Sequence, residues 1–234
     1  MADPRLPEIL AAWENAEHDP TARAAAVRET LAWSLAAADR ERAHEEPLRR
    51  AWLLACLVPG PPPVSIDDDR FSYAVRDLAR RPLVAEALAA IPESLPVLPG
   101  AERSRPADAD RPPARLREAL LADGTVGLEV GLAEFTPDGA PDLGSEGRLV
   151  PTWHLSWPEE STWTHGVDWN DFDAWVGGIL EAEAGVRYAE ACDIGWFRLG
   201  LDSPRPADEV LALFLRAVLA AYRREANVLG VDCP

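Results

Sequence analysis

The chain has 234 residues, a hydrophobic fraction of 47% and a net charge of −17, and all 23 of its basic residues are Arg. This composition is typical of a globular protein and not of a disordered one. The acidic balance argues against binding to nucleic acid or to an anionic membrane, because both need a surplus of cationic side chains. A partner with a basic surface is favoured instead, and solubility alone is the competing explanation for the charge.

Residues 1–90 are predicted to form a series of helices. Apolar residues follow helical spacing from Leu6 onward, and Pro59 with Gly60 is expected to end the third helix. The acidic residues 67–69 indicate the start of another helix, whose inner face would carry Phe71, Ala74, Val75 and Leu78. The pair Arg81-Pro82 would break that helix, and a short successor would follow.

A proline-rich stretch separates this half from the rest of the chain. Residues 91–113 contain six prolines and few large apolar side chains, a composition that favours extended, semi-rigid backbone. We therefore predict a helical domain at 1–90, a linker at 91–113 and an α+β domain at 114–234. An ordered loop lying across the surface is the alternative for the linker.

The C-terminal half is predicted to mix strands and helices. Apolar residues alternate over 126–132, the period of a half-buried strand, and a second strand at 149–157 would pair with it as a hairpin. A helix at 170–184, a strand at 194–201 and a final helix from Pro206 complete the series. The fold class is α+β: an N-terminal helical bundle followed by a small, largely antiparallel sheet with packed helices.

One segment combines aromatic and acidic residues. Residues 149–186 contain no Arg but hold five of the nine Trp residues. Indole rings beside carboxylates attract cations, and Trp is enriched at the energetic centres of interfaces. The predicted binding residues are Trp163, Trp169, Glu159, Glu160 and Asp168. The alternative is that the Trp residues belong to the core, as alternation predicts for Trp153 and helical spacing predicts for Trp175.

The same segment suggests a metal site but fails the tests for one. Phe172 occupies a position where a calcium loop needs an oxygen ligand, and the two histidines His154 and His165 lack the spacing of a zinc enzyme. They remain the candidates for a general base, for which Glu129 or Glu134 would be the partner. The sequence contains none of the common motifs for nucleophilic, phosphate-binding or dinucleotide-binding sites, so we predict no cofactor and no metal.

The cysteines and the apolar runs bear on localisation. Three cysteines without a CxxC pair, Cys56, Cys192 and Cys233, indicate reduced thiols. The longest apolar run, 51–58, is too short to span a bilayer, and the N-terminus does not have the pattern of a signal peptide. These features predict a cytoplasmic protein that does not enter a membrane.

These observations favour a non-catalytic, protein-binding accessory, adaptor or inhibitor protein that presents an acidic, Trp-rich surface. The alternative is a small-molecule enzyme with a Trp-lined pocket between the two halves.

Overall fold

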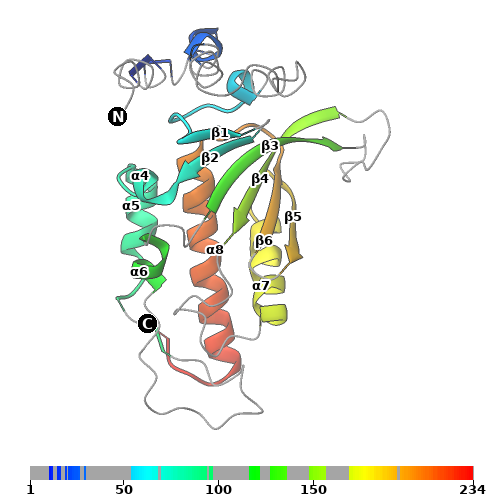
Figure 1. The fold of residues 1–234 in the computed structure, drawn as a ribbon. Helices are drawn as coiled ribbons and strands as arrows, with labels where there is room; N and C mark the ends of the chain where they lie inside the picture. The colour runs from blue at the N-terminus through cyan, green and yellow to red at the C-terminus, as the bar shows by residue number, and fades with distance from the viewer. Residues whose placement is uncertain are drawn as a thin grey trace.

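A computed structural model describes residues 11–12, 15–16, 19, 21–26, 29, 54–67, 70–93, 95–96, 116–121, 127–135, 148–156, 169–193 and 196–233. Within these ranges the protein is an α+β fold, with one six-stranded sheet and helices packed against it (Figure 1). The bundle expected for the N-terminal region lies mostly outside the described residues and stays a prediction. None of the helices in the described parts of the chain has the length and apolar character needed to cross a bilayer.

The sheet is antiparallel throughout, in the strand order β1-β2-β3-β4-β6-β5. Its centre is the predicted hairpin of β3 (Gly127–Phe135) and β4 (Arg148–Ser156), paired along nine residues. The predicted third strand is β6 (Trp196–Leu201), which pairs with β4. The three strands predicted for this half of the chain are therefore present, with bounds that differ by a few residues.

The helix predicted to start at 67–69 was wrong over most of its length. Residues Ser65–Asp67 form β1 and Arg70–Ala74 form β2, and only Val75–Leu78 form a helix, α4. The reason is tertiary: Phe71 and Tyr73 point to one side of β2, where they are buried against the core, and β2 pairs with β3. Aromatic residues suit a half-buried strand, and this packing outweighs the local helical spacing.

A further strand, β5 (Val186–Asp193), was not predicted. It pairs with β6 at the edge of the sheet, and its register shifts at two places. Shifts of this kind twist an edge strand and discourage pairing with a second chain. Among its described side chains only Ala189 is buried. An edge strand that buries so little needs no alternation of large apolar and polar residues, so its sequence lacks the pattern that marks a strand.

The helices cover one face of the sheet. The long helix α8 (Ala207–Val228) runs along this face, and α7 (Trp169–Glu181) lies beside it (Figure 1). The shorter helices α5 (Pro82–Ala89) and α6 (Leu116–Leu121) lie on the opposite side of α8 from α7 (Figure 1). All the residues predicted for the inner face of the last helix are buried: Val210, Leu213, Phe214, Ala217, Val218 and Ala221.

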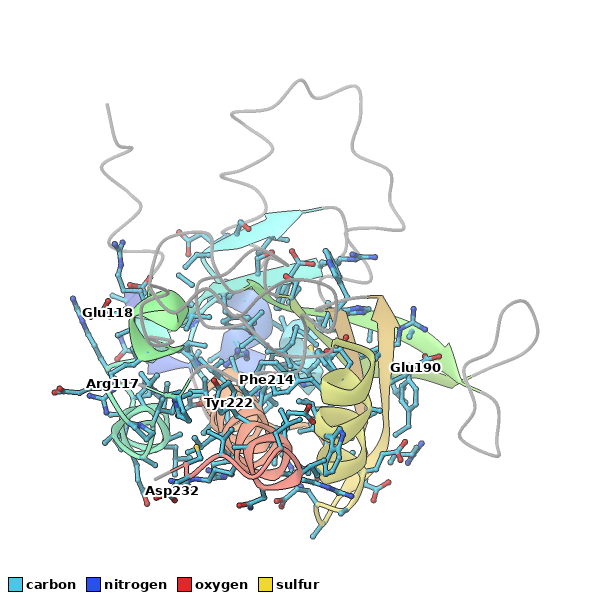
Figure 2. All side chains as sticks on the ribbon, turned by 90° about the horizontal axis from the view of Figure 1, so that it is seen from below. Arg117, Glu118, Glu190, Phe214, Tyr222 and Asp232 are labelled. Atoms are coloured by element: carbon cyan, nitrogen blue, oxygen red, sulfur yellow. The ribbon has the colours of Figure 1, made fainter. Side chains whose placement is uncertain are left out.

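Side chains from both predicted halves share one hydrophobic core. Tyr73 on β2 lies 5.8 Å from Trp153 on β4, measured between ring centroids, and Phe197 on β6 lies 5.7 Å from Phe214 on α8. Figure 2 shows Phe214 and Tyr222 in the interior. Most of the predicted linker at 91–113 lies outside the described residues, so the division of the chain stays a prediction. Of its described residues, Ile91 and Leu95 are buried in the core. In the described part of the chain, β2 and β3 pair with each other although they lie on opposite sides of the predicted linker in the sequence.

The loop that precedes β1 is fixed from two sides. Arg23 is buried and donates hydrogen bonds to the carbonyl oxygens of Gly60 and Pro61. Gly60 has a φ of +99°, in the region that only glycine adopts without strain, and it packs against Pro206 at the start of α8. The predicted stop at Pro59 and Gly60 therefore also anchors the N-terminal end of α8.

Candidate functional site

Most of the predicted binding residues lie outside the described part of the chain. This holds for Trp163, Glu159, Glu160 and Asp168, and also for the candidate base His165. Trp169 is the first residue of α7, but its side chain is not among those described. The acidic, Trp-rich surface therefore stays a prediction, and the larger part of the net charge of −17 comes from residues outside the described ranges.

Two other Trp residues of this segment are placed. Trp153 is buried in the core, as the alternation along its strand predicts. Trp175 is only half buried, at the surface between α7 and α8. The core interpretation therefore holds for Trp153, whereas Trp175 reaches the surface.

The face of the sheet turned away from α8, here called the polar face, carries a row of polar side chains across five strands. Strand register places these residues directly opposite one another in the order Ser72, Glu129, His154, Arg198 and Glu190. Side chains that are opposite on one face lie close enough to interact. Of the two carboxylates predicted as partners of His154, Glu129 therefore lies directly opposite it on the neighbouring strand.

The carboxylate of Glu129 interacts more directly with β2 than with His154. Ser72 Oγ donates to Glu129 Oε1 at 3.2 Å, and Arg70 Nη1 lies 3.8 Å from Glu129 Oε2. At the other end of the row, Tyr188 donates to Glu190 at 3.1 Å, and Figure 2 shows Glu190 at the periphery. Burial raises the pKa of Tyr188, so its hydroxyl stays protonated. Along the row, the carboxylates of Glu129 and Glu190 therefore lie on either side of the basic side chains His154 and Arg198.

His154 is held in its neutral form. Burial lowers the pKa of His154 to about 4, and the positive charges of Arg70 and Arg198 contribute in the same direction. At neutral pH the imidazole is therefore uncharged. A general base works best when its pKa lies near the working pH, so this environment gives His154 little strength as a base.

The lowered pKa predicts a pH dependence of stability. The unfolded chain binds a proton at His154 near pH 6.5 and the folded chain only near pH 4, so the contribution is complete above pH 6.5 and is lost as the pH falls toward 4. Compared with His154→Gln, which carries no proton, the natural protein should lose an additional ~1–2 kcal/mol of unfolding free energy between pH 7.5 and pH 5. Urea unfolding of both proteins at the two pH values measures this difference. Equal losses would mean that the imidazole titrates normally in the fold.

An exposed indole, Trp196, begins β6 on the polar face. Its side chain is 48% exposed, and it lies opposite Ser156 on β4. Beyond Ser156 the same row continues with Gly127 and Ala74, so short side chains lie beside the indole on the β4 side. On the other side its partner in register is Asp193 of β5. Trp196 was not among the residues predicted from the sequence, although a signal was present. Phe197, Leu199 and Leu201 alternate toward the core, which places Trp196 on the opposite face.

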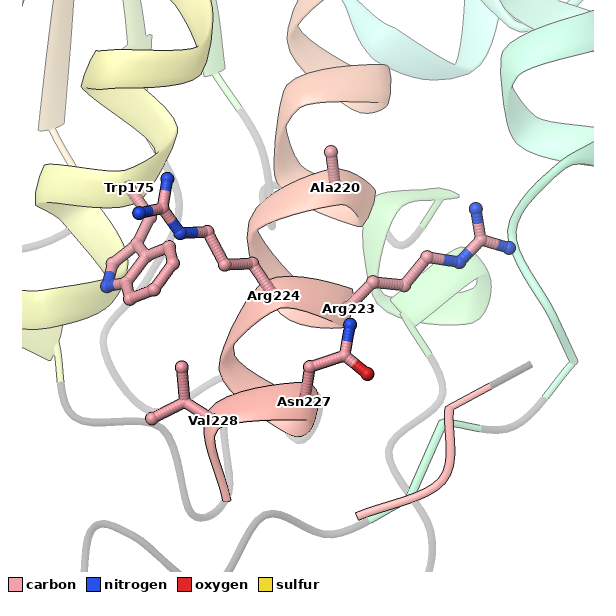
Figure 3. Close-up of a pocket in the computed structure, with 6 residues that line it drawn as sticks. All are labelled: Trp175, Ala220, Arg223, Arg224, Asn227 and Val228. Atoms are coloured by element: carbon pink, nitrogen blue, oxygen red, sulfur yellow. The ribbon is translucent and has the colours of Figure 1, made fainter. Parts of the chain in front are cut away.

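A groove on the surface of α7 and α8 is the second candidate site. It has a volume of ≈ 630 Å³ and is lined by Trp175, Ala220, Arg223, Arg224, Asn227 and Val228. Arg224 lies with its guanidinium carbon 3.4 Å from the centroid of the Trp175 ring, a cation–π contact between the two helices (Figure 3). Nothing in the sequence predicted this contact, because it depends on how the two helices pack.

The described residues hold no group of three or more His, Cys, Asp or Glu side chains that could bind a metal ion. Cys56 and Cys233 are both partly buried, and burial raises the pKa of the Cys233 thiol. The side chain of Cys192 is not among those described.

Comparisons with protein-family models, with curated proteins and with solved structures found no match. What the chain does is therefore inferred from its own residues.

Proposed function

We propose that this chain is a non-catalytic, protein-binding accessory, adaptor or inhibitor protein. The observation that carries the proposal is Trp196, a large apolar side chain left 48% exposed on the polar face. Trp is the residue type most enriched among interface residues that dominate binding energy. A partner that covers this indole would remove its apolar surface from water.

The surroundings of Trp196 suit a docking surface. Ser156, Gly127 and Ala74 follow it across the sheet, so a partner can approach the indole over low, short side chains. The adjacent polar row offers both carboxylates and guanidinium groups for hydrogen bonds at the rim. An apolar centre surrounded by polar groups is the common anatomy of protein interfaces.

The charge of the chain supports a partner with a basic surface. A net charge of −17 steers a cationic protein during encounter and repels polyanions. The predicted binding residues Trp163, Trp169, Glu159, Glu160 and Asp168 would supply part of that acidic surface. They belong to the proposal as predictions from the sequence.

The alternative, a small-molecule enzyme with a Trp-lined pocket, is supported by the groove beside Trp175. Its lining residues include neither a histidine nor a carboxylate, so the groove offers binding groups without an acid or base. The candidate base His154 does not line the groove. It lies on the sheet, and its pKa is about 4. These features favour binding over catalysis.

Replacing Trp196 with Ala is expected to weaken partner binding by ~2 kcal/mol, about 30-fold in Kd, because the anchor of the interface is lost. The partner is first identified in the native host by placing a photo-crosslinking amino acid at position 156, directly opposite Trp196, so that the indole itself is kept. Position 83 on α5 is the control, because Leu83 is exposed on the other side of the molecule and its crosslinks report non-specific contact. The partner captured only from position 156 is then purified for titration calorimetry.

The same titration tests the residues predicted from sequence. The double substitution Trp163→Ala and Trp169→Ala should also weaken binding, Leu83→Ala should not, and added salt should slow association of a basic partner. A partner that binds the Trp196→Ala protein and the double variant as tightly as the natural protein would refute the proposal.

A further inference from the structure

We propose that the groove beside Trp175 binds a small organic anion, with Arg224 holding its carboxylate or phosphate group. The inference is independent of the proposed protein partner, because the groove lies on α7 and α8, whereas Trp196 lies on the opposite face of the sheet.

The first reason is the state of Arg224. Its guanidinium is stacked on the indole of Trp175 at 3.4 Å, and within the described part of the chain no carboxylate forms an ion pair with it. Stacking engages the face of the guanidinium and fixes its plane, while the N–H groups lie in that plane and point outward. A fork of donors fixed in this way matches the two oxygens of a carboxylate or phosphate.

The second reason is the apolar surface beside the charge. Val228 lies one turn after Arg224 on α8 and is 66% exposed, and it lines the groove together with Trp175 (Figure 3). An exposed valine and an indole edge can cover an apolar ligand body while Arg224 binds its charged end. In contrast, Arg223 points to the other side of α8 (Figure 3), so we assign the anion to Arg224.

The size of the groove and the net charge of the protein decide which class of anion fits. The groove has a volume of ≈ 630 Å³ and is open to solvent, so it suits a small molecule that stays partly exposed. A nucleic acid or another polyanion would meet the repulsion of a chain with a net charge of −17, whereas a ligand with one or two charges meets little of it. The expected class is therefore a small carboxylate or phosphate monoester with an apolar or aromatic body.

Benzoate and phenyl phosphate are suitable probes, with benzamide as the uncharged control. The readout is the indole N–H signal of Trp175 in NMR spectra, assigned through the loss of that signal in Trp175→Phe. Both anions should shift this signal saturably, and benzamide should bind at least about tenfold more weakly, since a charge-assisted hydrogen bond contributes ~1.5–3 kcal/mol.

Two variants on the same helix separate a specific site from general charge. Arg224→Gln should reduce benzoate affinity at least about tenfold, whereas Arg216→Gln, which removes an exposed charge outside the groove, should leave it unchanged. Far-UV circular dichroism confirms that both variants are folded. The proposal is overturned if benzoate gives no saturable shift, or if the two variants reduce its affinity equally.

Discussion

Replacing Gly60 with Ala is expected to lower the free energy of unfolding by ~2–5 kcal/mol. Two costs add up. The backbone at Gly60 has a φ of +99°, which costs a residue with a side chain about 1–2 kcal/mol. In addition, the new Cβ would lie 2.5 Å from the Cβ of Pro206, and relieving such a contact typically costs about 1–3 kcal/mol.

Gly230 provides the matched control. It also has a positive φ, of +69°, but a Cβ added there would meet nothing within 4 Å. Gly230→Ala should therefore cost only about 1 kcal/mol, the strain of the backbone alone. Urea unfolding followed by circular dichroism gives both values, and equal losses would mean that the loop moves away from Pro206 without cost.

A double substitution isolates the contact itself. Pro206→Gly removes the Cβ that the new side chain would meet, and glycine is tolerated at the residue preceding a helix. Combined with Gly60→Ala, it should recover most of the ~1–3 kcal/mol assigned to the clash, since the Cα of residue 206 would still lie 3.1 Å from the new Cβ. Strict additivity of the two single effects would contradict that assignment.

The sequence predicted elements well where one period dominated. The final helix has apolar residues at helical spacing along its length, and β3 has clear alternation, so both were identified. Residues 71–78 satisfy both periods: Phe71, Ala74, Val75 and Leu78 have helical spacing, whereas Phe71 and Tyr73 alternate. Only pairing with β3 decides that the segment divides into β2 and α4. A local pattern contains no information about that partner.

The candidate sites depend still more on long-range packing. The sequence indicated that Glu129 or Glu134 could be a neighbour of His154, because both strands of the hairpin were predicted. Only the register of the structure selects Glu129, since Glu134 lies opposite Leu149. The sequence could not show that Arg198 and Arg70 act on the same imidazole, because β2 was not predicted as a strand and the position of β6 in the sheet was not known. The contact of Arg224 with Trp175 joins two helices whose packing is set by the whole core.

Replacing Trp153 with Ala should destabilise the protein by about 3–5 kcal/mol, the usual cost of removing a large buried aromatic side chain. Trp153 is only 1% exposed and packs against Tyr73 in the middle of the sheet. The same substitution at Trp196, which is 48% exposed, should change the unfolding free energy by less than about 1 kcal/mol. Urea unfolding of both variants gives the comparison.

The comparison of these two indoles bears directly on function. If Trp196→Ala is nearly neutral for stability yet weakens partner binding, the fold does not need the indole and binding does. That separation is what an interface anchor predicts, since its energy is realised only in the complex. If Trp196→Ala instead destabilises the chain as strongly as Trp153→Ala, the indole supports the fold, and its exposure is no longer an argument for a partner.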